Sequence, residues 1–415
     1  MRKTWLALTL LAVLLLSACG TSSTAGTTAG NTPAAAKPAA AKTAVPTTAP
    51  ATCTMVTRQP TPGPTEASIF PAVSAEDWSL GAETAKVTVL EYSDFQCPIC
   101  AKLAPVLVEL AKKYPQDVRF VYRHFPLSGH DKALLAAQAA EAAGKQGKFW
   151  EMSERLFAEQ ATWSAAGLDQ FAGFAEGYAR DLGLDVDTFK TDLTGETVVA
   201  KVKAAQDSAD KIGLPGTPFL LINNQVYEGP RDLATLSSIV DMIKLEDRQF
   251  NECPPMTIDV NKTYTATLKT ELGDVVLQLF PKKAPMAVNS FVFLARKGWF
   301  DNTIFHRVLP GFVAQGGDPS ASGLGGPGYA FSNEIQDLRF DKEGVVGMAN
   351  SGPNSNGSQF FITYAAQPHL DGGYTIFGQV LQGMDVLKKF PERDPQKGGE
   401  LPAGVKLISV TIEEK

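Results

Sequence analysis

Residues 89–100 read VLEYSDFQCPIC, and this stretch decides the fold of the first half of the chain. It begins in KVTVLEY (86–92), a β-branched and apolar run that predicts a buried strand. It ends in CPICAKLAPVLVELAKKY (97–114), which has helical spacing and a proline just inside its start. Two cysteines, two residues apart, therefore stand where a strand gives way to a helix.

The elements predicted on either side follow the order βαβ, helical block, ββα. VRFVYRHF (118–125) predicts a second strand, and residues 131–210, rich in Ala, Lys, Glu and Leu, predict several helices. PFLLINNQVYEG (218–229) predicts a hairpin that turns at Asn223-Asn224 and is followed by a helix. This order places strands before and after a large helical insertion.

The second half of the chain shows alternation in place of helical periodicity. TYTATLKTELGDVVLQLF (263–280) predicts a hairpin that turns at Gly273-Asp274, and residues 285–297 predict a helix. The remainder is rich in glycine and in predicted strands, which is typical of a closed antiparallel β structure. With 415 residues, the chain is long enough for two domains, each with its own core.

The N-terminus has the features of an export signal. MRKTWLALTLLAVLLLSACG (1–20) begins with two cations and continues with an apolar core, shorter than the roughly 20 residues that span a bilayer. Leu16-Ser17-Ala18-Cys19 resembles the lipobox of bacterial lipoproteins, in which the cysteine becomes the lipid-modified first residue. The alternative is an ordinary signal peptide with a chance cysteine. The resemblance implies an extracytoplasmic protein, anchored by lipid on Cys19 to the bacterial cell membrane, where disulfides persist.

Composition limits the partners. Residues 20–52 are almost wholly Ala, Thr, Pro, Gly, Ser and Lys, which predicts a flexible tether. The formal net charge of −6 gives no electrostatic footprint for nucleic acid. The chemistry of the protein must therefore be sought in its two globular halves.

The cysteine pair at the helix start has the pattern of a redox couple. A thiol at a helix N-terminus faces unpaired N–H groups and the positive end of the dipole, which should lower the pKa of Cys97. Cys100, one turn further in, is expected to be less exposed and to act as the resolving thiol. A zinc half-site and a structural disulfide are the alternatives. A zinc site needs a second ligand pair, and the four histidines and other cysteines lack that spacing, so we predict no metal and no cofactor.

Residues 86–245 resemble the DsbA-like branch of the thioredoxin-fold thiol–disulfide oxidoreductases, through VLEYSDFQCPIC, the helical block and GTPFLLINNQ (216–225). The resemblance implies an α/β thioredoxin fold with a helical insertion. It also implies a cis bond between Thr217 and Pro218, beside the disulfide, that presents backbone to a substrate peptide. Glu91 matches the family's buried acid, which moves a proton to or from Cys100. The alternatives are a trans proline that opens a strand and an exposed Glu91.

Cys53 and Cys253 flank this first domain on either side. We predict that they form a structural disulfide that clamps the end of the tether to the end of the domain, since free thiols are a liability outside the cell. Two unrelated free thiols are the alternative.

Three motifs of the second half, FHRVLPGFVAQGGD (305–318), GVVGMANSGPNSNGSQFFIT (344–363) and HLDGGYTIFGQV (369–380), resemble those of cyclophilin-type peptidyl-prolyl isomerases. The resemblance covers about residues 263–413 and implies an eight-stranded closed β-barrel with two helices. It implies that Arg307 is catalytic and donates toward the prolyl nitrogen of a twisted X–Pro amide, whose rotation otherwise meets a barrier of about 20 kcal/mol.

The same resemblance implies a substrate groove. The residues that match its walls, its hydrogen-bonding groups and their supports are Phe312, Val313, Gln315, Ala349, Asn350, Gln359, Phe361, His369 and Leu370. Two of them depart from the commoner pattern: His369 stands where many eukaryotic members have tryptophan, and Val313 replaces methionine. His306, next to Arg307, is predicted to be structural.

The predicted organisation is a lipoprotein signal peptide (1–18), a disordered tether (19–66), a DsbA-like domain (67–250), a linker (251–262) and a cyclophilin-type domain (263–415). The predicted function is a membrane-tethered folding catalyst that acts on unfolded or newly exported polypeptides and is reoxidised by an envelope redox partner. The alternative is a thiol–disulfide reductase or isomerase whose cyclophilin domain serves mainly as a peptide-binding holdase.

Overall fold

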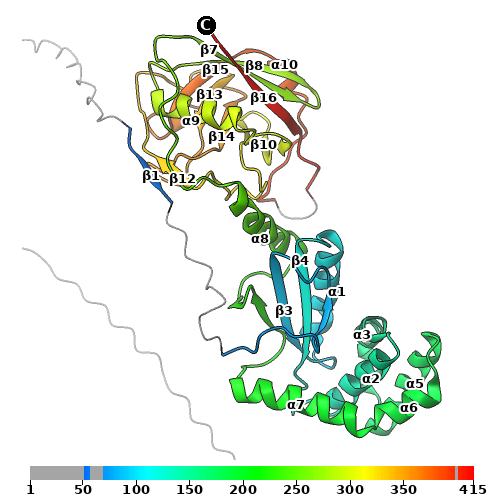
Figure 1. Cartoon of the computed structure of the whole chain (residues 1–415). Helices are drawn as coiled ribbons and strands as arrows, with labels where there is room; N and C mark the ends of the chain where they lie inside the picture. Colours follow the sequence, from blue (N-terminus) through cyan, green and yellow to red (C-terminus); the bar gives the residue numbers. More distant parts are fainter. Residues whose placement is uncertain (1–50, 57–68, 398–400) are drawn as a thin grey trace, which may run out of the picture. The chain divides into compact units, whose positions relative to one another are not determined.

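A computed structural model describes residues 51–56, 69–397 and 401–415 (Figure 1). The predicted signal peptide, the lipidation site Cys19 and most of the predicted tether lie outside these residues. Within the described ranges, no helix has the length and apolar character that crossing a bilayer requires.

The first domain is built on a five-stranded sheet with the order β2-β4-β3-β5-β6. Its strands are β2 (Trp78–Leu80), β3 (Val87–Ser93), β4 (Val118–His124), β5 (Phe219–Ile222) and β6 (Gln225–Val226). β3 and β4 are parallel and the other pairs are antiparallel, so the connection between β3 and β4 must cross over, and it does so through α1 (Pro98–Lys113). The predicted hairpin turn is confirmed, because Asn223 and Asn224 both have positive φ.

Helices cover both faces of this sheet. The apolar side chains of α1 and of α8 (Leu233–Leu245) share a core with Val87 and Val89 of β3. Leu90 and Tyr92, which point to the opposite face, pack with Ala209 of α7 (Glu196–Ile212). The predicted βαβ and ββα units are therefore joined in one two-faced sheet.

The predicted helical block is also present between β4 and β5 (Figure 1). It comprises α2 (Ala133–Lys145), α3 (Phe149–Ala158), α4 (Gln160–Ala165), α5 (Phe171–Asp181), α6 (Val186–Leu193) and α7. α2 is its central helix: nine of its residues are buried, seven of them alanines, and it contacts α3, α5, α6 and α7. Small side chains let these helices approach α2 closely.

The second domain has a curled nine-stranded sheet with the order β10-β11-β14-β13-β15-β8-β7-β16-β9. Its strands are β7 (Tyr264–Thr270), β8 (Gly273–Leu279), β9 (Thr303–Ile304), β10 (Arg307–Leu309), β11 (Val313–Gly316), β13 (Val345–Met348), β14 (Phe360–Thr363), β15 (Ile376–Gln382) and β16 (Lys406–Glu414). The predicted helices are α9 (Pro285–Arg296) and a short α10 (Met384–Leu387).

The prediction of an eight-stranded closed barrel was wrong, because this sheet is open. Its two edge strands, β9 and β10, are successive parts of one run of chain and are separated only by Phe305 and His306. A run of chain cannot pair with itself without reversing direction. Residues 303–309 therefore form one edge strand of the sheet and then the other, and no hydrogen-bonded ladder joins these two edges.

The first hairpin of this domain also turns two residues earlier than predicted. Thr270 pairs with Gly273, which leaves Glu271 and Leu272 as the turn. The Thr270 hydroxyl fixes this turn, because it donates to the Gly273 carbonyl and accepts from the Leu272 N–H. Gly273, with φ of +131°, opens β8 in a conformation that other residues rarely adopt.

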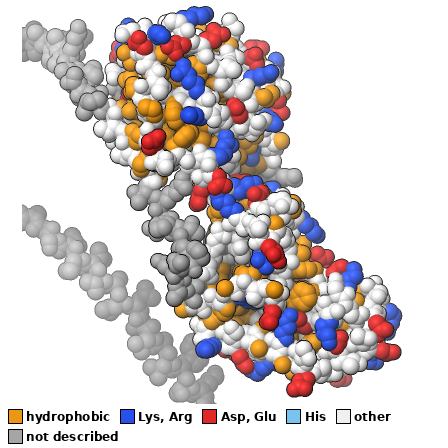
Figure 2. Space-filling model, viewed as in Figure 1, with side chains coloured by type: hydrophobic (Ala, Val, Ile, Leu, Met, Phe, Trp, Pro, Cys, Tyr) orange, Lys and Arg blue, Asp and Glu red, His pale blue; other side chains and the backbone are white. Residues whose placement is uncertain are grey.

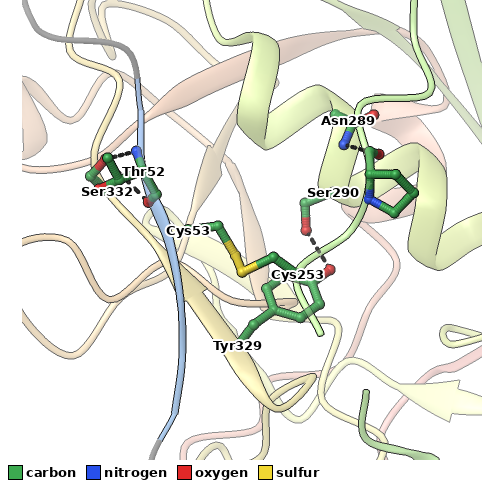
Figure 3. The surroundings of a disulfide bond; sticks show 8 residues. Thr52, Cys53, Cys253, Asn289, Ser290, Tyr329 and Ser332 are labelled. Carbon is green, nitrogen blue, oxygen red and sulfur yellow. Dashed lines mark hydrogen bonds between the residues drawn. A yellow bond between two sulfur atoms is a disulfide. The ribbon is translucent and has the colours of Figure 1, made fainter. Parts of the chain in front are cut away.

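Cys53 and Cys253 are joined by a disulfide, and both cysteines pack against the core of the second domain (Figure 3). β1 (Cys53–Met55) pairs with β12 (Tyr329–Phe331), and the disulfide lies beside the buried Tyr329, whose hydroxyl is 2.9 Å from that of Ser290. The bond therefore does not clamp the tether to the first domain, as the order of the chain suggested. It fastens the N-terminal strand to the second domain, where β12 offers β1 a pairing partner that the sequence does not reveal.

Candidate active sites

The cysteine pair lies where the strand-to-helix pattern placed it. Cys97 is the N-cap residue of α1, and Cys100 lies in the helix's first turn. Both thiols are free and buried, with Cys97 5% exposed and Cys100 fully covered. Between them, Ile99 is 58% exposed, so the surface over the pair is apolar.

The two thiols have opposite acidities. A hydrogen bond from the Cys100 thiol, aided by the N–H groups of Cys100 and Ile99 and opposed by burial, lowers the pKa of Cys97 to about 5. Burial, the hydrogen bond to Cys97 and the charge of Glu91 raise the pKa of Cys100 far above its usual value. At neutral pH, Cys97 is thus a thiolate and Cys100 a thiol, as a nucleophile and its resolving partner require.

Glu91 is fully buried on β3 and is not an exposed edge residue. Burial raises its pKa to about 8, and the Cys97 thiolate adds to this rise, while the Ser93 hydroxyl and Arg231 oppose it. Ser93 donates to Oε1 at 2.9 Å, whereas Oε2 has no partner among the described residues. The group can therefore hold a proton at neutral pH, next to a thiol that must gain or lose one.

The loop before β5 completes this site. The Thr217–Pro218 bond is cis, and the Thr217 carbonyl oxygen lies 3.4 Å from Cys97 Sγ. Arg231, from the loop before α8, donates to the Pro218 carbonyl at 3.1 Å. The structure thus brings Glu91, the two cysteines, Thr217 and Pro218 together.

The sequence did not point to Arg231, nor to Gln160 of the helical insertion. Gln160 is buried and its amide donates to the carbonyls of Phe95 and Cys97, at 2.6 and 2.9 Å. It thereby holds the turn that delivers Cys97 to the helix start. No local motif marks either residue, because each acts through contacts that join distant segments.

A second group of predicted residues meets on β10, β11 and β14 of the second domain. Arg307 pairs with Gln315 across β10 and β11, and Gln315 pairs with Phe361 of β14. The Arg307 guanidinium lies over the ring of Phe312, 5.5 Å from its centroid. The ring of His369 stacks on Phe312 at 5.7 Å. One charged donor therefore stands beside an aromatic wall.

The floor of this groove is apolar. Val313, Phe361 and Leu370 are buried in one cluster, against which Phe312 and Ala349 pack. The sequence missed Phe340, which belongs to the same cluster and stacks on Phe361 at 5.5 Å. In the sequence, only Gly347 hints at Phe340, and it does so indirectly. Gly347 leaves the space that both rings fill, since a Cβ there would lie 2.6 Å from Phe361 and 2.9 Å from Phe340.

Amides line the other side of the groove. Gln359 accepts from Gln315 at 3.0 Å and donates to the carbonyls of Gly323 and Gly325. Asn350 donates to the Gly373 carbonyl at 3.3 Å. His306 is buried behind Arg307, and burial lowers its pKa to about 4, which keeps its ring neutral. It is therefore poorly suited to carry a proton at neutral pH.

The surface in Figure 2 carries acidic and basic side chains interspersed with hydrophobic ones. This face of the described residues has no extended field of a single sign.

Comparison with known proteins gives the class of each half. The family model described as thioredoxin matches residues 74–242, so the first domain is thioredoxin-like. The model described as cyclophilin type peptidyl-prolyl cis-trans isomerase/CLD matches residues 265–412.

Two relatives agree in sequence with the second assignment, and one solved structure is also similar to this part of the chain. Peptidyl-prolyl cis-trans isomerase CYP18-1 of Arabidopsis thaliana is 47% identical over 152 residues, which cover 36% of this chain and 95% of that protein. Peptidyl-prolyl cis-trans isomerase cypE of Dictyostelium discoideum is 50% identical over 129 residues, which cover 30% of this chain and 83% of that protein. A crystal structure of a cyclophilin-type isomerase from Cryptosporidium parvum is 36% identical, covering 36% of this chain and 98% of that one, with a TM-score of 0.34.

The chain is thus a two-domain protein in which a thioredoxin-like domain precedes an isomerase domain. It belongs to the cyclophilin-type peptidyl-prolyl cis-trans isomerase family.

Proposed function

We propose that the protein is a folding catalyst that combines thiol–disulfide exchange at Cys97 and Cys100 with peptidyl-prolyl isomerisation at the Arg307 groove. Both reactions correct slow steps in the folding of a newly exported chain. The observation that carries the first activity is the acidic Cys97 thiol at the start of α1, beside the Thr217 carbonyl and above a buried acid. Its DsbA-like character rests on this arrangement and on the helical insertion.

The exchange reaction proceeds in two attacks. A substrate thiolate attacks Cys97 of the Cys97–Cys100 disulfide, and the electron pair of the broken S–S bond goes to Cys100, which takes a proton. A second substrate thiolate then attacks the substrate sulfur of the mixed disulfide, which releases Cys97 as a stable thiolate. The substrate dithiol is oxidised, the protein disulfide is reduced, and an envelope redox partner reoxidises the pair.

The isomerase site works without a nucleophile or a metal. The ring of the substrate proline enters the pocket of Phe312, Phe361 and Leu370, while Gln315 and Asn350 hold the substrate backbone. Arg307 donates toward the prolyl nitrogen as it loses conjugation with the carbonyl, which stabilises the twisted amide.

The proposed place of action is outside the cytoplasm, on a lipid anchor at Cys19. The Cys53–Cys253 disulfide supports it, because such bonds persist in oxidising compartments. Radiolabelled palmitate should be incorporated into the full chain in a bacterial host and not into a Cys19→Ala variant. Equal labelling of the two chains would contradict the anchor.

One experiment tests the combined function. A reduced, unfolded substrate that has both a disulfide and a cis proline in its native state is refolded with the full chain. We expect Cys97→Ser to abolish disulfide formation and Arg307→Ala to slow only the proline-limited phase. A chain that binds the substrate but accelerates neither phase would identify a holdase instead.

A further inference from the structure

A cavity of about 420 Å³ lies between α1 and α3 in the first domain. One wall is a face of α1 on which Ala101 and Ala104 leave space, and the other is formed by Trp150 and Phe157 of α3. Lys112 also lines the cavity, with a side chain that is 72% exposed, so this end is open to solvent.

Two buried polar atoms belong to residues that line this cavity. Glu91 and Tyr122 pair in register on the parallel strands β3 and β4, so their side chains are neighbours on the same face of the sheet. Glu91 Oε2 and the Tyr122 hydroxyl both lack a hydrogen-bond partner among the described residues. Because buried polar atoms nearly always have a partner, and water supplies it where a cavity reaches them, this face of the cavity suits water.

A third polar group comes from the helix itself. Pro105 has no N–H, so the Ala101 carbonyl one turn earlier cannot receive the usual helical hydrogen bond from it. Both residues line the cavity. A carbonyl of α1 that lacks its usual helical donor therefore belongs to a residue that lines the cavity.

Three neighbouring segments bring ionisable groups to Glu91. α1 contributes Cys97 and Cys100, β4 contributes Tyr122, and the loop before α8 contributes Arg231. The other ionisable residues that line the cavity are Glu109, Lys112 and Glu154. Lys112 and Glu154 are 3.9 Å apart across the cavity, and both side chains are exposed. The charge of Arg231 acts on Glu91 and opposes the rise of its pKa. An arginine keeps its proton at neutral pH, so Arg231 does not exchange one with Glu91.

We infer that this cavity is the path by which Glu91 exchanges protons with solvent, with the Tyr122 hydroxyl as a relay between cavity water and the carboxyl group. The inference rests on the proposed thiol–disulfide exchange. When a substrate thiolate breaks the Cys97–Cys100 bond, the Cys100 sulfur receives the bonding electron pair and the proton of Glu91. Water in the cavity then returns a proton to the Glu91 carboxylate. On reoxidation, Glu91 first releases its proton to water in the cavity, and the carboxylate then accepts the proton of Cys100.

The test uses Ala104→Leu, a substitution that narrows the cavity without altering a charge. Oxidised full-length protein is mixed in single turnovers with a coloured aromatic thiol that is ionised from pH 6 to pH 9. At pH 6 Glu91 already holds the proton that Cys100 needs, so Ala104→Leu should react as fast as the natural sequence. At pH 9 the proton must come from solvent, and the same variant should react about tenfold more slowly.

Two further variants keep the result interpretable. Tyr122→Phe retains the ring and removes the hydroxyl. It should react as fast as the natural sequence at pH 6 and about tenfold more slowly at pH 9. This variant tests the path even if Ala104→Leu fails to fold. Ala172→Leu, an equal enlargement on the exposed face of α5, should match the natural sequence at both values. If each variant's rate relative to the natural sequence is the same at pH 6 and at pH 9, the cavity is not the proton path of Glu91. If the natural sequence forms no mixed disulfide at either pH, it is the proposed exchange that fails.

Discussion

The sulfur of Cys97 lies 3.4 Å from the carbonyl oxygen of Thr217, a residue 120 positions further along the chain. Through this contact the start of α1 meets the loop before β5, and the more acidic of the two thiols is placed beside the backbone of Thr217. An extended peptide that pairs with this loop would carry its own sulfur to Cys97. The contact thus joins a reactive atom to a recognition surface.

The first prediction concerns the acidity of Cys97. Because the hydrogen bond from Cys100 is the main cause of its low pKa, Cys100→Ala should raise that pKa well above 5, whereas Cys100→Ser, which keeps a donor, should raise it less. Thiolate absorbance in the ultraviolet, followed from pH 3 to pH 10, gives each value. Equal midpoints in the two variants would show that the helix start alone sets the acidity.

The second prediction concerns stability and pH. The pKa of Glu91 rises from 4.5 to about 8 on folding, so the folded protein binds more protons than the unfolded chain between these values. The raised pKa of Glu91 therefore adds to the free energy of unfolding at low pH, and this addition is lost as pH rises toward 8. Relative to Glu91→Gln, the natural sequence should be less stable at pH 9 than at pH 6 by more than about 1 kcal/mol in urea titrations. A constant difference would mean that Glu91 titrates normally.

The third prediction concerns the isomerase groove. Arg307→Ala should lower the rate of prolyl isomerisation of a short peptide by about a hundredfold, because the twisted amide loses its charged donor. Affinity for the peptide should change little, since Phe312 and Phe361 remain. Arg296→Ala, which removes a surface ion pair with Glu414, is the matched control. A variant at position 307 that retains full activity would exclude this arginine from catalysis.

The fourth prediction concerns the disulfide. The bond closes a loop with a sequence separation of 200, for which the chain-entropy relation gives a stabilisation of up to about 5 kcal/mol. Cys53→Ser and Cys253→Ser should lower the free energy of unfolding of the second domain equally, and the double variant should be no worse than either. Additive losses in the double variant would show that the cysteines stabilise the fold separately.

Local patterns predicted much of this structure, and long-range pairing explains the rest. The strand-to-helix change at Cys97, the Asn223-Asn224 turn and the alternation of β7 and β8 all appear in short segments. Short segments of sequence could not show whether the barrel closes, because closure depends on which sheet edges residues 303–309 form. The same is true of β1, whose partner strand lies about 280 residues away.

The sites divide in the same way. Cys97, Cys100 and Arg307 stand in motifs, and their neighbours in sequence mark them. Gln160 and Arg231 reach the cysteine site from the helical insertion and from a distant loop, so only the folded chain reveals them. That the Tyr122 hydroxyl has no hydrogen-bond partner in the described part of the chain is likewise visible only once its neighbours are known.

Whether the first domain oxidises its substrates is decided by the reduction potential of the Cys97–Cys100 couple, measured by equilibration of the full chain with glutathione buffers. An acidic Cys97 thiolate stabilises the reduced form, so the account predicts a potential well above that of thioredoxin, roughly −270 mV, as an oxidising catalyst requires. A potential at or below that value, or a pair that never equilibrates with glutathione, would contradict it.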